Sequence, residues 1–272
     1  MMAVHLFKKM DFSLKYQKYM VPISNELINV VLSYVKGKTN GRPLEMALDV
    51  GCGTGCYTLP LAPHFKKVLG LDVSESQISV AKKITMANNV SYMMAPAEKL
   101  PLKDASVDLV HSGLAAHWFT LDKFINESVR VLKTRGCLAF HGFVPLFELE
   151  YKHLSHDLNV VVKEAWVTLF DHGDNSNDEM ICQYQNIYEA IPLKDKKHIT
   201  EMLQKVPMSI PEFIGFIESL YMCQNFKEKD VEKAEQFLIQ TEKRLREVLG
   251  EEADTACMNM YVKYYCVLAC KQ

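Results

Sequence analysis

The chain has 272 residues, 49% of them hydrophobic, and a formal net charge of −2 at pH 7. Its length allows one large core, with or without an added lobe, and its composition excludes a disordered chain. The near-neutral charge gives no reason to expect a nucleic-acid or membrane partner. No apolar run reaches about 18 residues, and the first nine residues lack the apolar core of a signal peptide, so we expect a cytoplasmic protein. The eight cysteines contain no C-x-x-C pair, which favours free thiols.

The N-terminal segment is aromatic and then helical. Its aromatic residues are Phe7, Phe12, Tyr16 and Tyr19. A helix is predicted to begin at Pro22, because proline suits the first helical position, and apolar residues at helical spacing continue it to Tyr34. The polar stretch 37–43 then ends this helix.

A strand predicted at 46–50 leads into three glycines at alternate positions, Gly51, Gly53 and Gly55. Glycine at such a turn lets the backbone approach a ligand that a Cβ would block. The residues from Cys56 onward are predicted to open a helix, and the N–H groups at a helix N-terminus suit an anionic group. This stretch therefore predicts a ligand-binding turn.

A second apolar strand, at 68–71, ends in Asp72, and an acid at this place can hold both hydroxyls of a ribose. A dinucleotide site needs G-x-G-x-x-G. Cys56 stands where the third glycine of that pattern would be, so a dehydrogenase-like domain is the less favoured alternative. The observed G-x-G-x-G, with Asp49 two residues before it, resembles motif I of the class I S-adenosylmethionine-dependent methyltransferases, and Asp72 resembles their ribose-binding acid.

Strands and helices continue to alternate along the chain. The predicted elements are a helix opened by a capping box of Ser74 and Gln77, strands at 90–94 and 107–110, a helix at 121–132 and a strand at 137–141. This alternation predicts a parallel, doubly wound sheet.

Residues 95–102 resemble the G-D-A-E-x-L-P-F turn of the same methyltransferases, in which an acid meets the adenine amino group and the alanine supplies a backbone N–H. Pro96 stands where that acid usually is, and proline offers neither an acceptor side chain nor an N–H. The adenine would then be held by the backbone of Ala97, by Glu98 or by apolar walls.

The strand at 107–110 resembles the F-D-x-V strand of this family and runs into residues 111–119. Ligands of open α/β sheets lie at the carboxyl ends of the strands, near the switch in strand order. We therefore expect this segment to form the wall between the cofactor and the methyl acceptor. His117 could act as a general base, as a donor that positions an acceptor carboxylate, or as a packed histidine beside Trp118.

Residues 142–255 are predicted to be mainly helical, with polar breaks at 171–178 and 194–197. A second capping box, of Ser209 and Glu212, opens one of these helices. The last apolar run, 258–270, is predicted to be a long strand, paired with a strand near 182–186.

These elements predict an α/β fold. We expect a Rossmann-like, doubly wound, mostly parallel sheet of seven strands, with a C-terminal antiparallel strand pair and a helical insert or lid. The expected parts are an N-terminal lid with the first helices (1–45), a cofactor-binding core (46–141), a helical substrate-binding insert (142–255) and the last strand of the core sheet (256–272).

Most of the chain resembles the small-molecule methyltransferases similar to trans-aconitate methyltransferase and to the ubiquinone/menaquinone-biosynthesis type, which carry a methyltransferase type 11 domain. The resemblance beyond the cofactor core is carried by residues 115–119, 188–192 and 209–221. It implies S-adenosylmethionine as the cofactor, S-adenosylhomocysteine as its product, and a small-molecule acceptor that is a carboxylate, a hydroxyl or an amine. The cofactor contacts that it implies are Asp49, Gly51, Cys52, Gly53, Gly55, Asp72, Val73, Ala97, Glu98 and Leu114. The lid and substrate residues that it implies are Tyr16, Tyr19, His117 and Trp118.

Several alternatives stay open. A protein or nucleic-acid methyltransferase is less favoured, because no Asn-Pro-Pro-Tyr motif follows the fourth strand. The departure at Pro96 allows a non-catalytic S-adenosylmethionine-binding protein. His153 and His156 lie three apart on a predicted helix, but no second ligand pair accompanies them, so we expect no metal site. We expect a monomer or a weak homodimer.

Overall fold

The computed structural model describes residues 7, 9–173 and 176–272, with the backbone alone at 176 and 177. These residues form two compact units. The first contains the described parts of 1–21, 144–178 and 203–263, and the second contains 22–143, 179–202 and 264–272. The whole predicted cofactor-binding core therefore lies in the second unit.

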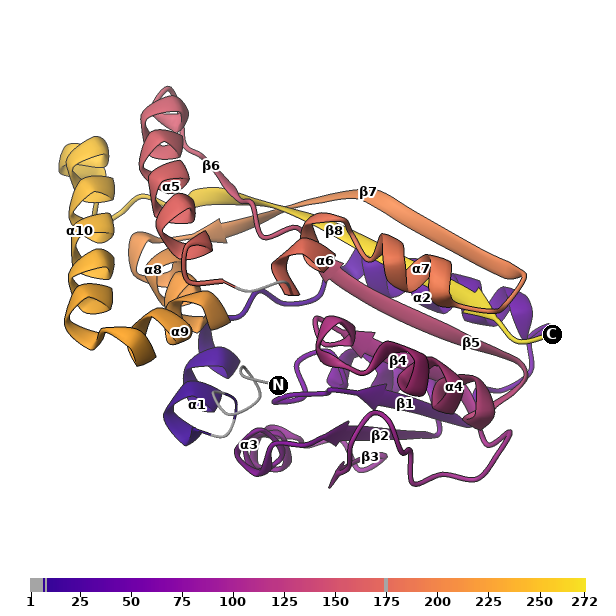
Figure 1. Cartoon of the computed structure of the whole chain (residues 1–272). Coiled ribbons are helices and arrows are strands. Elements are labelled where there is room, and N and C mark those ends of the chain that lie inside the picture. The colour runs from indigo at the N-terminus through magenta and orange to yellow at the C-terminus, as the bar shows by residue number, and fades with distance from the viewer. Residues whose placement is uncertain (1–6, 8, 174–175) are drawn as a thin grey trace. The chain divides into compact units, whose positions relative to one another are not determined.

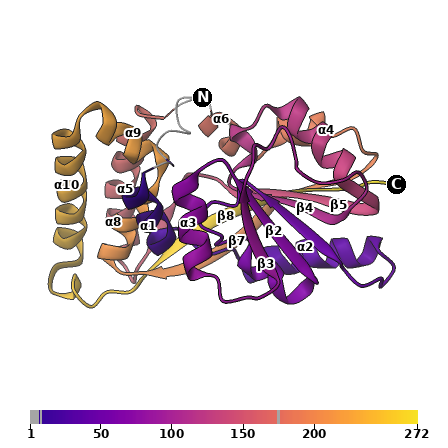
Figure 2. The ribbon, with the colours of Figure 1, turned by 90° about the horizontal axis from the view of Figure 1, so that it is seen from below.

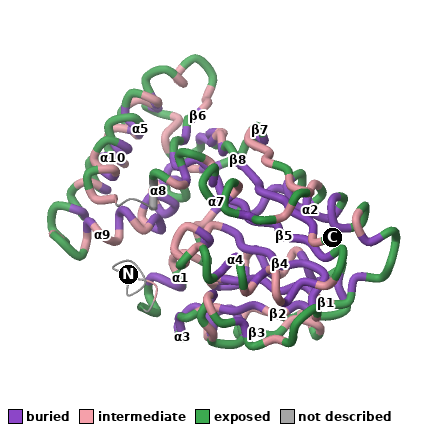
Figure 3. The backbone as a smooth tube through the Cα atoms, turned by 45° about the vertical axis from the view of Figure 1, so that its right-hand side comes forward, coloured by how far each residue is buried: buried purple, intermediate pink, exposed green. Residues whose placement is uncertain are grey.

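A parallel sheet forms the centre of the second unit (Figure 1). Its parallel strands are β1 (Met46–Val50), β2 (Lys67–Asp72), β3 (Val90–Met94), β4 (Val107–Gly113) and β5 (Leu132–Phe143). They lie in the order β3-β2-β1-β4-β5, and each neighbouring pair is parallel. Figure 3 shows β1 and β4 largely buried, and β4 is buried over its whole length. The strand order reverses between β1 and β4, which is the switch point of a doubly wound sheet.

Antiparallel strands complete the sheet. The last strand, β8 (Met258–Cys270), pairs with β5 in antiparallel register. Strand β7 (Asp195–Met208) also pairs with β8, and the short β6 (Glu148–Glu150) pairs with the first part of β8. The predicted α/β fold with a mostly parallel sheet is confirmed, and the described residues form eight strands where seven were expected.

Helices cover both faces of the parallel sheet, as the opposite positions of α2 and α4 show in Figures 1 and 2. The helices of this unit are α2 (Asn25–Lys38), η2 (Leu59–His64), α3 (Glu75–Ile84), η3 (Ala116–Trp118), α4 (Leu121–Val131) and α7 (Gln185–Ala190). Helix α4 buries Phe124, Ile125, Ser128 and Val131, which form one stripe at helical spacing and face the sheet.

The first unit is mainly helical. Its helices are α1 (Met10–Tyr19), α5 (Ser155–Phe170), α8 (Ile210–Ser219), α9 (Tyr221–Lys229), α10 (Val231–Leu249) and η4 (Gly250–Glu252), and α6 (Ser176–Ile181) lies at its sequence boundary. Helix α10 packs against α5, α8 and α9, and α1 packs against α8. The predicted capping box of Ser209 and Glu212 is present in both directions.

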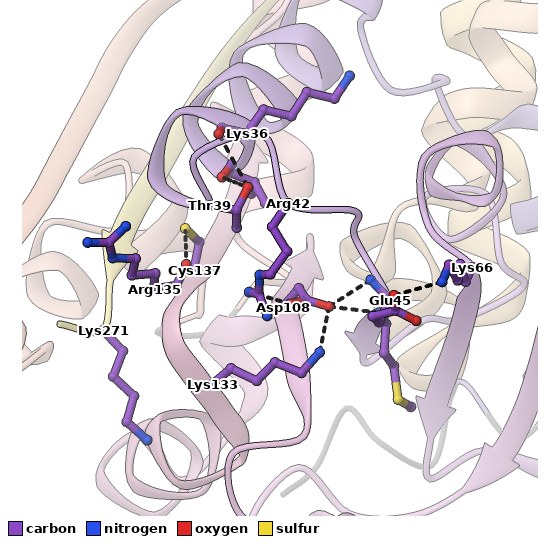
Figure 4. A network of polar contacts seen from close by, with 12 residues as sticks. Lys36, Thr39, Arg42, Glu45, Lys66, Asp108, Lys133, Arg135, Cys137 and Lys271 are labelled. Carbon is purple, nitrogen blue, oxygen red and sulfur yellow. Dashed lines mark hydrogen bonds and ion pairs between the residues drawn. The ribbon is translucent and has the colours of Figure 1, made fainter.

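A buried carboxylate joins three segments at the amino end of β4 (Figure 4). Asp108 accepts hydrogen bonds from the N–H groups of Glu45 and Met46, at 2.8 and 3.0 Å. It also forms ion pairs with Arg42 at 2.8 Å and Lys133 at 3.0 Å. This contact set fixes the start of β1 beside β4 and β5.

Some local predictions were wrong. The first predicted helix begins at Asn25 rather than at Pro22, because the Ser24 side chain caps it. The segment after the glycines forms the 3₁₀ helix η2, which begins at Leu59 rather than at Cys56.

The predicted partner of the last strand was also wrong. Residues 182–184 form a turn and 185–190 form helix α7, so no strand lies near 182–186. The partners of the last strand are β5, β6 and β7. Strand β7 begins within the lysine-rich stretch 194–197, which was read as a break.

Candidate functional site

The glycine loop lies at the carboxyl end of β1. The N–H groups of Gly51 and Cys52 donate to the carbonyl oxygen of Leu71 in β2, at 2.8 and 2.9 Å. Gly51, Gly53 and Gly55 all have positive φ angles, of 69°, 55° and 86°. A residue with a Cβ rarely adopts this conformation, so glycines are needed to make the turn.

The surroundings of the three glycines differ. A Cβ on the first or the third glycine would overlap a neighbouring side chain, Ala115 or Tyr92 respectively. On Gly53, the nearest described atom that a Cβ would meet is Oε1 of Gln77, at an ordinary contact distance of 3.5 Å. Packing within the protein therefore explains the outer glycines, whereas a Cβ on Gly53 would overlap no described protein atom.

Asp72 ends β2 beside this loop. Its carboxylate accepts hydrogen bonds from the N–H groups of Gly53, at 2.9 Å, and Ser74, at 2.8 Å. Burial raises the pKa of this carboxyl group, and the two N–H donors act in the opposite direction. Val73, which follows it, is apolar and yet 44% exposed. An acid that can accept from a ribose thus stands next to one exposed apolar side chain.

Asp49 is fully buried at the end of β1. One carboxylate oxygen accepts from the hydroxyl of Thr58 at 2.5 Å, and the other lies 2.7 Å from Nδ1 of His111. Asp49 thus fixes the far end of the glycine loop through Thr58. Its expected contact with a cofactor stays a prediction.

His111 continues this buried chain of polar groups, because its Nε2 lies 2.9 Å from Nε2 of His141. The His141 ring also contacts Tyr57 edge-on, with ring centroids 5.2 Å apart. Burial lowers the pKa of His141 well below its usual value, and His111 adds to this effect. Our sequence predictions placed His111 in the wall segment 111–119 and His141 at the end of a strand. They did not predict that the two rings meet, since each is a single residue within an apolar strand.

The predicted adenine-binding turn lies after β3. Ala97 is buried, while Oε1 of Glu98 accepts a hydrogen bond from the backbone N–H of Thr120 at 2.8 Å. Thr120 is the N-cap residue of α4, so Glu98 stabilises the start of this helix. A contact between Glu98 and a cofactor stays a prediction.

Leu114 follows β4 in a left-handed backbone conformation, with φ of 54°. Its N–H donates to the carbonyl oxygen of His141 at 2.9 Å. A leucine in this conformation is strained by roughly 1–2 kcal/mol, and such strain is concentrated at functional sites. The expected place of Leu114 beside the ligands stays a prediction.

His117 lies in η3, just after Leu114. Its Nδ1 is 2.6 Å from the hydroxyl of Tyr184, and its ring packs against Trp118 with centroids 4.8 Å apart. Two of the four predicted lid and substrate residues, which are neighbours in sequence, are thus in contact. Tyr184 was not predicted, because its contact with His117 spans 67 positions and no local pattern indicates it.

Tyr16 and Tyr19 lie in α1, within the first unit. The Tyr16 ring packs against Phe12 with centroids 6.0 Å apart. A Cβ on Gly215 of α8 would meet the Tyr19 ring, so this tyrosine packs closely on that helix. Their expected role as a lid stays a prediction.

The described ranges show neither a metal site nor a membrane-spanning helix. There, no group of three or more His, Cys, Asp or Glu side chains is arranged to hold a metal ion. In the same part of the chain, no helix is both long and apolar enough to cross a membrane.

Comparisons with known proteins give one consistent result. A family model described as "Methyltransferase domain" matches residues 48–140. A Dictyostelium discoideum protein named as a methyltransferase is 31% identical over 214 residues, which are 77% of this chain and 74% of that protein. The malonyl-[acyl-carrier protein] O-methyltransferase of Methylococcus capsulatus is 37% identical over 107 residues, which are 38% of this chain and 39% of that enzyme.

The solved structures agree on the fold. An Anaeromyxobacter dehalogenans protein, named as a type II methyltransferase, superposes with a TM-score of 0.68 at 21% sequence identity. The match covers 88% of this chain and 95% of that one.

Proposed function

The chain belongs to the S-adenosylmethionine-dependent methyltransferases, and we propose that it transfers the methyl group of S-adenosylmethionine to a small-molecule acceptor. The observation that carries this proposal is the contrast within the glycine loop. The outer glycines face protein side chains at overlapping distances, whereas a Cβ on Gly53 would overlap no described atom, and Gly53 donates its N–H to Asp72. This is a cradle that a Cβ would fill, next to an acid that can accept from ribose hydroxyls.

The residues present fit the cofactor. Asp72 would accept from the ribose hydroxyls, the loop from Gly51 to Gly55 would border the methionine part, and Val73 and Ala97 would contact the adenine. When bound, S-adenosylmethionine supplies an electrophilic methyl group. The protein's own task is then to align a nucleophile with this methyl group and to exclude water.

The acceptor side is proposed at the carboxyl end of β4. This end lies beside the switch point of the sheet, where ligands of doubly wound folds bind. Leu114, His117 and Trp118 follow directly. The near-neutral charge of the chain supports a small molecule over nucleic acid. The Methylococcus relative, of which the chain spans about two fifths, is named for transfer to malonyl-[acyl-carrier protein].

Calorimetry tests the cofactor assignment. We expect S-adenosylmethionine and S-adenosylhomocysteine to bind to the wild-type protein, and NAD not to bind. Asp72→Ala should weaken the binding of S-adenosylmethionine and of S-adenosylhomocysteine by about 1.5–3 kcal/mol, the scale of a hydrogen bond to a charged group. Asp104→Ala is the matched control, because Asp104 is a surface residue paired with Arg130. Wild-type protein that binds NAD and not S-adenosylhomocysteine would overturn the proposal.

A further inference from the structure

We propose that Tyr184 is a positioning residue that donates its hydroxyl proton to Nδ1 of His117 and thereby holds this imidazole in the tautomer with its hydrogen at Nε2. The proposal rests on the proposed function, because it assigns His117 the task of a hydrogen-bond donor rather than a general base in methyl transfer. Its basis is the contact of 2.6 Å between the Tyr184 hydroxyl and His117 Nδ1.

The backbone that carries Tyr184 is strained. Gln183 and Tyr184 are consecutive non-glycine residues with φ of 56° and 62°. Each left-handed residue costs roughly 1–2 kcal/mol, so the pair persists only because its surroundings hold it. The backbone N–H of Tyr184 donates to the backbone carbonyl oxygen of Glu179 at 2.9 Å. Nε2 of His198 donates to the carbonyl oxygen of Gln183 at 2.6 Å. Strain that is held so specifically points to a function for the side chain it places.

Tyr184 is also completely buried. Its ring packs edge-on against Tyr265, with centroids 4.9 Å apart. Burial raises the pKa of the Tyr184 hydroxyl far above its usual value. The phenol is therefore neutral and keeps one proton to donate.

The direction of the hydrogen bond follows from the burial of Tyr184. A neutral imidazole carries a hydrogen on one nitrogen and a lone pair on the other. The Tyr184 hydroxyl is fully buried and is hydrogen-bonded to His117 Nδ1 in the structure. A buried hydroxyl that kept its proton without an acceptor would cost about 1–3 kcal/mol. The phenol proton then goes to the lone pair of His117 Nδ1, and the imidazole keeps its own hydrogen at Nε2.

This tautomer decides what His117 can do. A general base needs a lone pair to accept a proton from the acceptor, and here the ring lone pair is engaged by Tyr184. A hydrogen at Nε2 can instead be donated to an oxygen lone pair of the acceptor. Such a site suits an acceptor oxygen that carries no proton. This oxygen forms the new O–CH₃ bond, the S–CH₃ bond breaks with its electron pair left on sulfur, and no proton has to be removed.

Nitrogen-15 NMR of histidine-labelled protein, with S-adenosylhomocysteine added, tests the proposal. The resonances of His117 are assigned from their absence in His117→Asn. We expect a protonated Nε2 and an unprotonated Nδ1 in the wild-type protein. Tyr184→Phe should lower the ratio of His117 protonated at Nε2 to His117 protonated at Nδ1 roughly five- to tenfold, the scale of one hydrogen bond. Tyr188→Phe is the matched control, since Tyr188 lies in α7 and stacks on His198.

The possible outcomes separate this inference from the proposed function. A protonated Nδ1 in the wild-type protein, or an unchanged tautomer in Tyr184→Phe, would overturn the role of Tyr184. If Tyr184→Phe does not fold, the wild-type spectrum alone decides which nitrogen of His117 carries the hydrogen. Calorimetry on the same samples reports S-adenosylhomocysteine binding, so a failure of the cofactor assignment would be seen independently of the tautomer.

Discussion

Gly53→Val tests the glycine loop most sharply, because the structure separates its effect on folding from its effect on binding. A Cβ at Gly53 meets the Gln77 amide oxygen at 3.5 Å, an ordinary contact distance. The loss of folding stability in Gly53→Val therefore comes mainly from the left-handed backbone conformation, with φ of 55°. This conformation costs roughly 1–2 kcal/mol for a residue with a side chain. A ligand beside Gly53 would have to share its space with three new carbon atoms. Overpacking of this kind costs about 1–3 kcal/mol, or roughly 5- to 150-fold in affinity.

Gly41→Val provides the control. Gly41 has φ of 72°, and a Cβ there meets no described atom within 4 Å, so its conformational cost matches that of Gly53→Val. Thermal unfolding should show similar losses of stability in the two variants. Calorimetry should show weaker binding of S-adenosylhomocysteine in Gly53→Val alone. Wild-type affinity in Gly53→Val, or an equal loss in Gly41→Val, would refute the reasoning.

Three other predictions concern stability and protection. Asp108→Ala should destabilise the protein by about 3–5 kcal/mol in denaturant unfolding, because it leaves the buried donors around Asp108 without their acceptor; a loss below about 1 kcal/mol would contradict this role. The lowered pKa of His141 means that the unfolded chain binds a proton below about pH 6.5 that the folded chain does not. The contribution of His141 to the free energy of unfolding should be fully present above pH 6.5 and fall at lower pH by at most about 1.4 kcal/mol per pH unit. His141→Asn should reduce this slope. An unchanged slope would contradict the lowered pKa of His141. If residues 142–255, Tyr16 and Tyr19 form the expected lid, hydrogen exchange there should slow when product cofactor and acceptor are both bound, whereas protection confined to residues 47–120 would count against it.

The parts of the fold that sequence could predict are those with a strong local signal. The strands at 46–50, 90–94 and 258–270 have the predicted boundaries, because each is an apolar run next to a turn or a polar segment. Strand β7 was missed for a physical reason. Its first residues are lysine-rich, and the side chains that it buries, Met202, Val206 and Met208, come only in its second half. Charged residues are typical of strands with an unpaired edge, so they hid the strand pattern.

The residues of the candidate site likewise divide into those that a local pattern predicts and those that only the fold brings together. The glycines and Asp72 could be predicted, since a turn and a strand end carry them within a short stretch. His111 and His141 meet only because β4 and β5 pair in register, with Gly113 opposite His141. Tyr184 reaches His117 only through two left-handed residues, for which Gln and Tyr give no signal. Glu98 is the opposite case. A local motif identified this residue, but its hydrogen-bond partner, Thr120, lies at the start of the next helix.

Methyl transfer from labelled S-adenosylmethionine tests the central claim most directly. The protein would be incubated with the labelled cofactor and a whole-cell extract, and the products would then be separated by mass. The proposed function predicts that the label appears in small molecules, that Asp72→Ala reduces this transfer, and that Asp104→Ala does not. Label confined to proteins or nucleic acids, or no transfer by a protein that binds S-adenosylhomocysteine tightly, would contradict a small-molecule methyltransferase.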